Sequence, residues 1–306
     1  MDFVSHTQGG EPVTAVVCKG DRVVGGFAGV IVKRVGLRIL GSPFPGWSTS
    51  YMGFNLETGI DRREAVKALC QFAFSELGCV HLEVMDRHLT REDIRGLGVR
   101  CRLLSGFEID LSRPLDALFE AMTPACRRCI RKSEREGVTV VSVQDDQFPS
   151  EYHSQLVEVF SRQSLAPTYG ECRVRSLISH LLPTGRLLLA RAQDRDGRCI
   201  ATGIFPAMNG TMYFWGGASS QSSLLLRPNE AVQWFAMRYW RDRGVTKYDM
   251  GGGGEYKRKY GGHSIEVPWV RASKFLGIET LREFGRIAAA VKQRLSVSGE
   301  GHTTGR

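Results

Sequence analysis

Alternating apolar and polar positions predict strands in the first forty residues. Residues 13–18 and 22–32 follow this pattern and are joined by Lys19-Gly20-Asp21, which predicts a β-hairpin. A third short strand is expected at 37–40. The segment 41–47 combines glycine, proline and aromatic residues and predicts a turn-rich loop with exposed aromatic side chains.

A helical apolar period begins near residue 65. Asp61 and Glu64 form a capping box ahead of it, and Gly78 ends it. The pattern then predicts a strand at 80–85, a short helix capped by Thr90, and a strand at 99–109.

The second half of the chain shows a longer version of the same order. Helices are expected from 113 and over 123–136, 150–163, 171–182 and 229–243; strands are expected at 138–143, 186–192, 199–208, 211–215, 245–249 and 265–270. Asn209-Gly210 predicts a tight hairpin turn. A short helical turn near Tyr256 and an amphipathic helix over 280–295, packed on the body, complete the chain, and the tail from 296 is expected to be disordered. The order indicates a tandem α/β (α+β) protein whose first copy is reduced.

Composition places the chain among globular proteins. Of its 306 residues, 42% are hydrophobic and 24% charged, and Lys+Arg exceed Asp+Glu by 41 to 32, a net charge of +9. The surplus favours anionic partners such as phosphates, nucleotides, RNA or an anionic membrane face. No transmembrane run and no secretory signal are evident, so we expect a cytoplasmic protein.

The eight cysteines are scattered through apolar patterns, which indicates reduced thiols. Cys126 and Cys129 have C-x-x-C spacing, but no second pair or histidine cluster completes a zinc site, so we expect no metal.

The most informative segment is the glycine run that follows the strand at 245–249. Gly251, Gly252 and Gly253 are followed by Gly254 and then by the cationic, aromatic stretch 255–260. Consecutive glycines pack no side chains and suit a main chain that a ligand approaches closely. Exposed N–H groups beside lysines suit an anion or a developing oxyanion.

Several motifs in this order resemble the Fem-type branch of the GNAT acyltransferases. They are Gly216-Gly217-Ala218-Ser219, Pro228-Asn229 opening a helix, Tyr248-Asp249-x-Gly-Gly, Tyr256-Lys257-x-x-Tyr260-Gly261, the basic helix 127–138 and the loop Gly41-Ser42-Pro43-Phe44. The likeness covers about residues 13–270. It implies tandem GNAT-like lobes with mixed, mostly antiparallel sheets flanked by helices. We divide them as a reduced lobe (1–110), a complete lobe (111–275), and a C-terminal helix and tail (276–306).

The resemblance implies an N-acyltransferase that forms an amide bond by direct attack. Acceptors would be the amine of a cell-envelope precursor, an amino sugar or a peptide-like metabolite. No tightly bound cofactor is expected, since the donor is a substrate: acyl-CoA or aminoacyl-tRNA. The segment 218–229 lacks the glycine spacing with which CoA-dependent GNAT enzymes hold the pyrophosphate, and the donor stays open. The rival interpretation is a non-catalytic GNAT-like module that binds RNA or a nucleotide sugar.

Two residues are candidates for catalysis. Lys257 matches the lysine that Fem-type enzymes place after the glycine loop, where it would stabilise negative charge; the alternative is a solvated lysine on a short helix. Asp249 could accept a proton from the attacking amine or orient it; the alternative is a hydrogen bond to the turn that follows it. The general base is not identified.

The remaining candidates are expected to contact substrate. Besides Gly251, Gly252 and Gly253 they are Tyr256 and Tyr260, Arg227 at a helix start, and Trp47 and Tyr51 in the first-half loop. Arg227 suits a phosphate at the helix N-terminus, and the alternative is a surface arginine. For Tyr256 and Tyr260 the alternative is packing under the glycine loop, and for Trp47 and Tyr51 it is packing beneath the first-half loop. The helix with Arg127, Arg128, Arg131, Lys132 and Arg135 would be a landing surface for RNA or a phosphorylated acceptor, or simply a solvated face.

Overall fold

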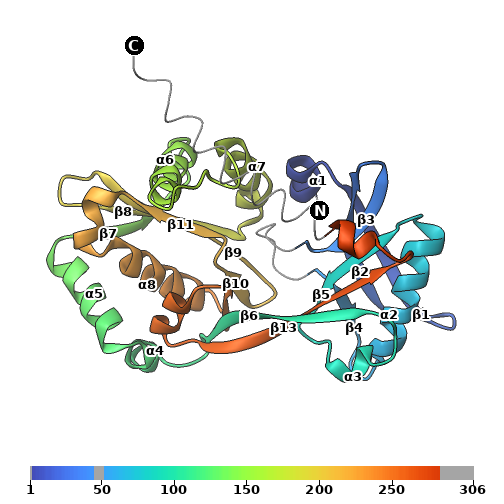
Figure 1. Cartoon of the computed structure of the whole chain (residues 1–306). Coiled ribbons are helices and arrows are strands. Elements are labelled where there is room, and N and C mark those ends of the chain that lie inside the picture. The colour runs from blue at the N-terminus through green and yellow to red at the C-terminus, as the bar shows by residue number, and fades with distance from the viewer. Residues whose placement is uncertain (1, 45–51, 283–306) are drawn as a thin grey trace, which may run out of the picture. The chain divides into compact units, whose positions relative to one another are not determined.

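The computed structural model describes residues 2–44 and 52–282, which form two compact units (Figure 1). Among the described residues, unit 1 consists of those up to Ser105 together with 266–282, and unit 2 consists of Gly106–Ile265. Two strands, β6 (Arg100–Asp110) and β13 (His263–Ser273), begin in one unit and end in the other. We predicted lobes that are each continuous in sequence, divided at 110/111 and 275/276. In the structure, unit 1 instead combines an early and a late segment of the chain.

Unit 1 is built on the predicted hairpin. β1 (Glu11–Lys19) pairs with β2 (Arg22–Arg34), β2 with β3 (Leu37–Ser42), and β3 runs parallel to β5 (His81–Met85). The C-terminal half of β13 pairs with β5, and the short β4 (Phe54–Leu56) pairs with β2. The helical elements of the unit include α1 (Asp2–Gln8), α2 (Arg62–Gln71), the π-helical turn η1 (Phe72–Glu76) and α3 (Arg91–Ile94).

Helix α2 shows why the sequence folds this way. The Asp61 side chain accepts hydrogen bonds from the N–H groups of Arg63 and Glu64 and so caps the helix. The apolar stripe of α2 then packs into a core with Leu82 and Val84 from β5.

Unit 2 holds a mixed sheet. Its strand order is β6, β12 (Lys247–Gly252), β10 (Thr211–Tyr213), β9 (Cys199–Met208), β8 (Leu187–Gln193) and β7 (Thr139–Ser142), with β11 (Gly216–Ser219) also paired to β9. Strands β10 and β12 are parallel, and the other described pairs of the unit are antiparallel.

Helices cover both faces of the unit 2 sheet (Figure 1). α6 (Phe148–Ser161) and α7 (Glu171–Leu181) lie on one face, and α8 (Pro228–Arg241) and α5 (Pro124–Arg135) on the other. The shorter elements are α4 (Leu115–Ala121), η2 (Leu182–Thr184), η3 (Gln221–Leu226) and η4 (Glu255–Tyr260).

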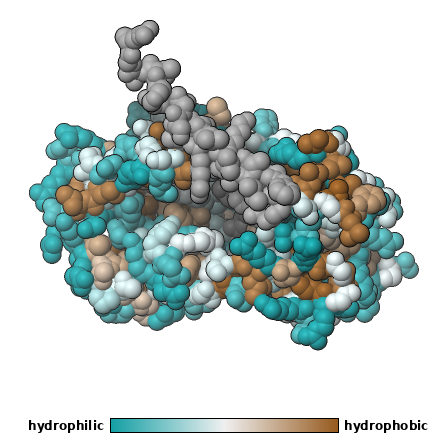
Figure 2. All heavy atoms as spheres, viewed as in Figure 1, coloured by the Kyte–Doolittle hydropathy of each residue, from teal (hydrophilic) through white to brown (hydrophobic). Residues whose placement is uncertain are grey.

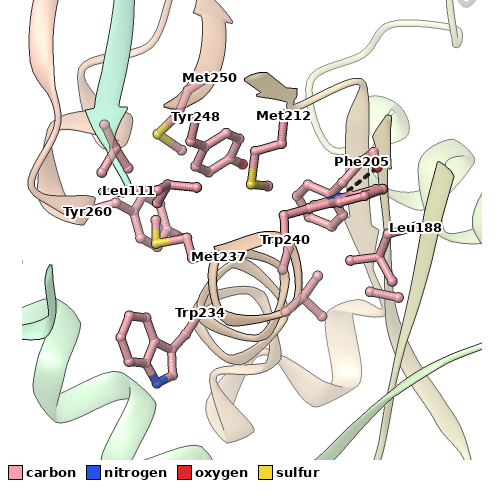
Figure 3. Packing of buried hydrophobic residues seen from close by; sticks show 14 of the residues in the cluster. Leu111, Leu188, Phe205, Met212, Trp234, Met237, Trp240, Tyr248, Met250 and Tyr260 are labelled. Carbon is pink, nitrogen blue, oxygen red and sulfur yellow. Dashed lines mark hydrogen bonds between the residues drawn. The ribbon is translucent and has the colours of Figure 1, made fainter. Parts of the chain in front are cut away.

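The core under α8 is shown in Figure 3. Met237 and Trp240 of the helix pack against Phe205, Met212 and Tyr248 of the sheet. The Trp240 indole N–H donates to the Phe205 carbonyl over 3.1 Å, so this large side chain is buried without an unpaired donor. The core fixes β12, whose end carries the glycine run.

Most predicted elements are present, including both hairpins and the helices that become α2, α5, α6, α7 and α8. The described elements that were not predicted are α1, β4, β11 and η3. Phe54 of β4 is buried, and its ring centroid lies 5.4 Å from that of Phe27. The predicted helix at 280–295 lies mostly outside the described residues.

Figure 2 shows polar and apolar side chains interspersed over the visible face of both units. Within residues 2–44 and 52–282, no helix combines the length and apolarity needed to span a membrane. The same stretch contains no cluster of three His, Cys, Asp or Glu side chains placed to hold a metal ion. All eight cysteines are free thiols.

Candidate functional site

The strand before the glycine run continues beyond Asp249. β12 extends to Gly252, which pairs with Gly106 of β6, while Asp249 pairs with Glu108. Met250 and Gly251 therefore oppose the single residue Phe107, which is a β-bulge. Gly251 has φ +71°, a left-handed conformation that glycine adopts without the steric cost of a Cβ atom. The first glycines thus build a kink in the sheet, and the open loop begins after them.

Asp249 supports this bulge from within. Its side chain is 1% exposed, and Oδ1 accepts the Gly251 N–H over 2.6 Å. Its carbonyl accepts the Phe214 N–H over 2.9 Å. The hydrogen bond to the following turn, weighed above as an alternative to a chemical role, is therefore present, and proton transfer by Asp249 stays a prediction.

Lys257 is the second support. Its side chain is buried, and Nζ donates to the carbonyl oxygens of Met250 and Gly252 over 2.6 and 2.8 Å. These two carbonyls flank Gly251, so one ammonium group closes the bulge. Burial lowers the pKa of Lys257, and the Asp249 carboxylate acts in the opposite direction. The interpretation of Lys257 as a solvated surface lysine is wrong.

The sheet opens beside Lys257. β10 pairs with β12 up to Tyr213, which lies opposite Asp249. After Phe214 the chain continues as β11, and the described pairing of β11 is with β9. β11 and β12 therefore diverge, and diverging strands leave main-chain donors and acceptors for a ligand. The Phe214 ring centroid lies 5.9 Å from Lys257 Nζ, which places the ammonium at this opening.

Aromatic side chains border β11 on the face that carries α6 and α7. The Tyr152 and Tyr169 hydroxyls are 2.8 Å apart, and the Tyr169 ring centroid is 5.0 Å from that of Trp215. A Cβ atom on Gly216 would lie 2.2 Å from Tyr152 Oη, so glycine permits this close approach. Burial raises the pKa of both tyrosines, so they are neutral at physiological pH. We did not predict these residues, although the run of aromatic residues before Gly216-Gly217 was a visible signal.

Glu108 is a further residue that the sequence analysis missed. It lies directly across the strand pair from Asp249, so both carboxylates project from the same face of the sheet. Glu108 is 7% exposed, and its Oε1 is 3.9 Å from His263 Nε2. One signal was available: a glutamate between Phe107 and Ile109 interrupts an apolar strand.

The start of α8 differs from a simple anion site. Arg227 is exposed there and has φ 62° and ψ 40°, a left-handed conformation unusual for arginine. Glu230, in the first turn, is 8% exposed and accepts a hydrogen bond from Lys259 Nζ over 2.7 Å. A carboxylate at this position already complements the helix dipole, which disfavours a second anion at the same place.

The other predicted contact residues are divided. Tyr256 is 55% exposed and lies against Gly254, beside the glycine run, whereas Tyr260 is 3% exposed and packs in the core. Gly253 has φ +66°. Trp47 and Tyr51 lie outside the described residues. The structure thus brings together Asp249, Gly251, Gly252, Tyr256 and Lys257, and it places Arg227 at the start of α8.

Known proteins show the same architecture. Residues 124–259 match the family described as Acetyltransferase (GNAT) domain. The structure resembles that of FemX (TM-score 0.72, 14% identity, covering 87% of this chain and 89% of that one). It also resembles L-PGS from Bacillus licheniformis (TM-score 0.57, 13% identity, 93% and 94% covered). A tandem GNAT protein from the clavulanic acid biosynthesis pathway, solved without AcCoA, gives a TM-score of 0.55 at 13% identity (86% and 83% covered).

At these identities the structural likeness establishes the fold, which is the predicted α/β architecture of tandem GNAT-like proteins. No curated protein matches the sequence significantly. The matched segment contains β11, α8, β12 and Lys257, so Met250 and Gly251 of the bulge lie within the residues that match the GNAT family, whereas Phe107 lies before them.

Proposed function

We propose that this chain, a GNAT/Fem-type acyltransferase, transfers an activated aminoacyl group from aminoacyl-tRNA to an amine by direct attack. The observation that carries the proposal is the buried Lys257 ammonium, fixed by two carbonyls at the point where β11 and β12 diverge. A fixed positive charge in a buried site stabilises a developing negative charge without reorganisation.

The reaction proceeds through a tetrahedral intermediate. The amine nitrogen attacks the ester carbonyl carbon, and the carbonyl oxygen becomes an oxyanion. When the intermediate collapses, the C–N bond is complete, the C–O ester bond breaks, and a proton passes from nitrogen to the leaving ribose oxygen. Among the described residues, the carbonyls of Met250 and Gly252 accept two of the three Lys257 N–H donors. In our proposal the third N–H donates to the oxyanion.

Carboxylates supply the opposite charge. Asp249 and Glu108 project side by side from the sheet, and they attract the protonated amine and take up its proton before attack. Tyr256, the least buried of the aromatic candidates in η4, contacts the substrate beside Gly253. Acceptors of this chemistry include the amine of a cell-envelope precursor, an amino sugar or a peptide-like metabolite.

The start of α8 favours the aminoacyl donor. Acyl-CoA would place its pyrophosphate at this helix start, where the sequence lacks the glycine spacing and Glu230 already supplies negative charge. An acyl thioester is the second candidate, because the clavulanic acid pathway protein of the same fold is described in relation to AcCoA. Arg227 is exposed and precedes the first turn of α8, so it stays a candidate for contact with a donor phosphate outside that turn.

Product formation tests the proposal. The purified protein is incubated with an amine library and either charged tRNA or acyl-CoA, with and without RNase. Amide products that appear with charged tRNA and disappear with RNase support the aminoacyl donor; RNase-resistant products with acyl-CoA overturn it. Absence of product with both donors, together with RNA binding, would favour the non-catalytic module.

A further inference from the structure

The predicted basic helix, α5, carries a stripe of cations without acidic partners. Arg128, Arg131 and Arg135 are exposed and follow an i, i+3, i+7 spacing, which places them on one side of the helix over about 10 Å. Lys132 is half-buried beside them. Across residues 2–44 and 52–282, no carboxylate lies within 4.0 Å of these four side chains. The helix itself contributes one acidic residue, Glu134, against five cations.

Arg127 is different from the other four. Its guanidinium is 3.2 Å from the Glu120 carboxylate and donates to the carbonyls of Glu120 and Met122. It therefore completes the end of α4, and the remaining cations are left for an external partner.

Aromatic rings hold two of the arginines in place. The Arg131 guanidinium lies 5.3 Å from the Phe119 ring centroid, Phe119 is 5.5 Å from Trp234, and the Arg238 guanidinium lies 5.7 Å from Trp234. These contacts form one continuous row, Arg131–Phe119–Trp234–Arg238, which links α5, α4 and α8. A cation–π contact holds a guanidinium beside the ring while its N–H groups stay available to phosphate.

A second stack extends the surface along α8. The Arg243 guanidinium is 3.6 Å from the Tyr239 ring centroid, and Tyr239 is 6.1 Å from Phe235. Phe235 and Tyr239 are half-buried, so part of each ring faces solvent. We call this region the α5–α8 surface: Arg128, Arg131, Lys132 and Arg135 of α5, Phe119, and Trp234, Phe235, Arg238, Tyr239 and Arg243 of α8 and the turn after it.

The α5–α8 surface begins beside the candidate site. The Thr123 N–H, at the start of α5, donates to the Lys259 carbonyl of η4, two residues after Lys257. From this point α5 extends away from η4 for about 18 Å, and its cations lie along this length. A flexible strand that lies along α5 therefore ends near the segment that holds Lys257.

We infer that the α5–α8 surface binds RNA, with arginines on the phosphates and half-exposed rings available to unpaired bases. Cationic grooves interleaved with aromatic rings are the features that hold single-stranded nucleic acid. An anionic membrane would need exposed apolar side chains to insert, and no large hydrophobic residue of the described α5 and α8 is exposed. The inference rests on the proposed use of an RNA-borne donor.

Binding of labelled, deacylated tRNA over a range of salt concentrations tests this inference. The variant Arg128→Gln/Arg131→Gln/Arg135→Gln removes three cations from α5 and keeps good helix formers. Each lost phosphate contact lowers the slope of log K against log salt by about 0.7, so the slope should fall by about 2 and affinity at 0.1 M salt by about 100-fold. Arg131→Lys/Arg238→Lys keeps the charge, and it should weaken binding about fivefold without changing the slope.

The matched control is Lys19→Gln/Lys33→Gln/Arg34→Gln, which removes the same charge from exposed positions of unit 1. An equal loss of tRNA affinity in the two triple variants would overturn the inference. It would also be overturned if phosphatidylglycerol vesicles bound the protein in an α5-dependent way and tRNA did not bind. If the α5 variant transfers the aminoacyl group from charged tRNA with an unchanged KM for tRNA, RNA binding by the α5–α8 surface is refuted and the proposed function stands. α5-dependent tRNA binding without any transfer would support the surface and refute the function.

Discussion

Replacement of Lys257 by methionine separates the structural role of this residue from a catalytic one. Methionine fills a similar volume and cannot donate to the carbonyls of Met250 and Gly252, which Nζ contacts at 2.6 and 2.8 Å. Each hydrogen bond from a charged donor contributes about 1.5–3 kcal/mol. The ammonium no longer has to be buried, however, and burial already lowers its pKa. We therefore expect a net destabilisation of about 2 kcal/mol, a Tm lower by about 4–8 °C.

The effect on turnover should be larger than the effect on stability. Removal of one preorganised oxyanion donor lowers kcat about 10²–10³-fold, which corresponds to about 2.7–4 kcal/mol of transition-state stabilisation. The assay is amide formation at saturating donor and acceptor, at a temperature where circular dichroism shows that the variant is folded.

Lys259→Met is the matched control. Lys259 Nζ lies 2.7 Å from the Glu230 carboxylate, and loss of this ion pair destabilises the start of α8 without touching the bulge. We expect a comparable fall in Tm with kcat near that of the wild type. A kcat of Lys257→Met within threefold of the wild type, or an equal loss in Lys259→Met, would refute the catalytic role.

Three further predictions concern the same region. Because oxyanion stabilisation needs the protonated amine, kcat should fall as pH rises through the lowered pKa of Lys257, and a pH–rate profile should show that limb in the wild type. Between the lowered pKa of the folded protein and the ordinary pKa of lysine, the unfolded chain binds a proton that the folded protein has lost. The free energy of unfolding of the wild type should therefore rise with pH relative to that of Lys257→Met. A fall in kcat over this range then reflects the lost proton and not unfolding. Gly251→Ala forces alanine to φ +71° and should cost about 1–2 kcal/mol in urea denaturation; an unchanged midpoint would contradict the bulge. Arg227→Gly relieves a left-handed arginine and should stabilise the fold by about 1 kcal/mol while raising the donor KM; a lower KM would exclude a phosphate contact.

Local signals in the sequence predicted the elements well. Asn209-Gly210 predicted a hairpin turn, and Asn209 and Gly210 have φ 51° and 71°, as such a turn requires. Asp61 and Thr123 predicted helix starts, and both side chains accept the expected capping hydrogen bonds. These features depend on residues close together in the chain, which is why a single sequence is sufficient.

The site depends on partners that are distant in sequence. The bulge at Met250 and Gly251 exists because β12 pairs with β6, more than 130 residues earlier, through Gly252 and Gly106. Without that pairing the strand was expected to stop at Asp249, and Lys257 could be either exposed or buried. Glu108 was missed for the same reason, since its proximity to Asp249 comes from the register of two strands and not from any local motif.

The interleaving of the two units has a consequence for synthesis of the protein. The described part of unit 2 comes from one continuous stretch, Gly106–Ile265, whereas β5 of unit 1 pairs with β13, so that His81 meets Ser273 across 192 positions. The ribosome therefore releases all of this stretch before the last strand of unit 1 exists. Because closing so long a loop is slow, we expect unit 2 to form first and the sheet of unit 1 to remain incomplete until β13 has been synthesised.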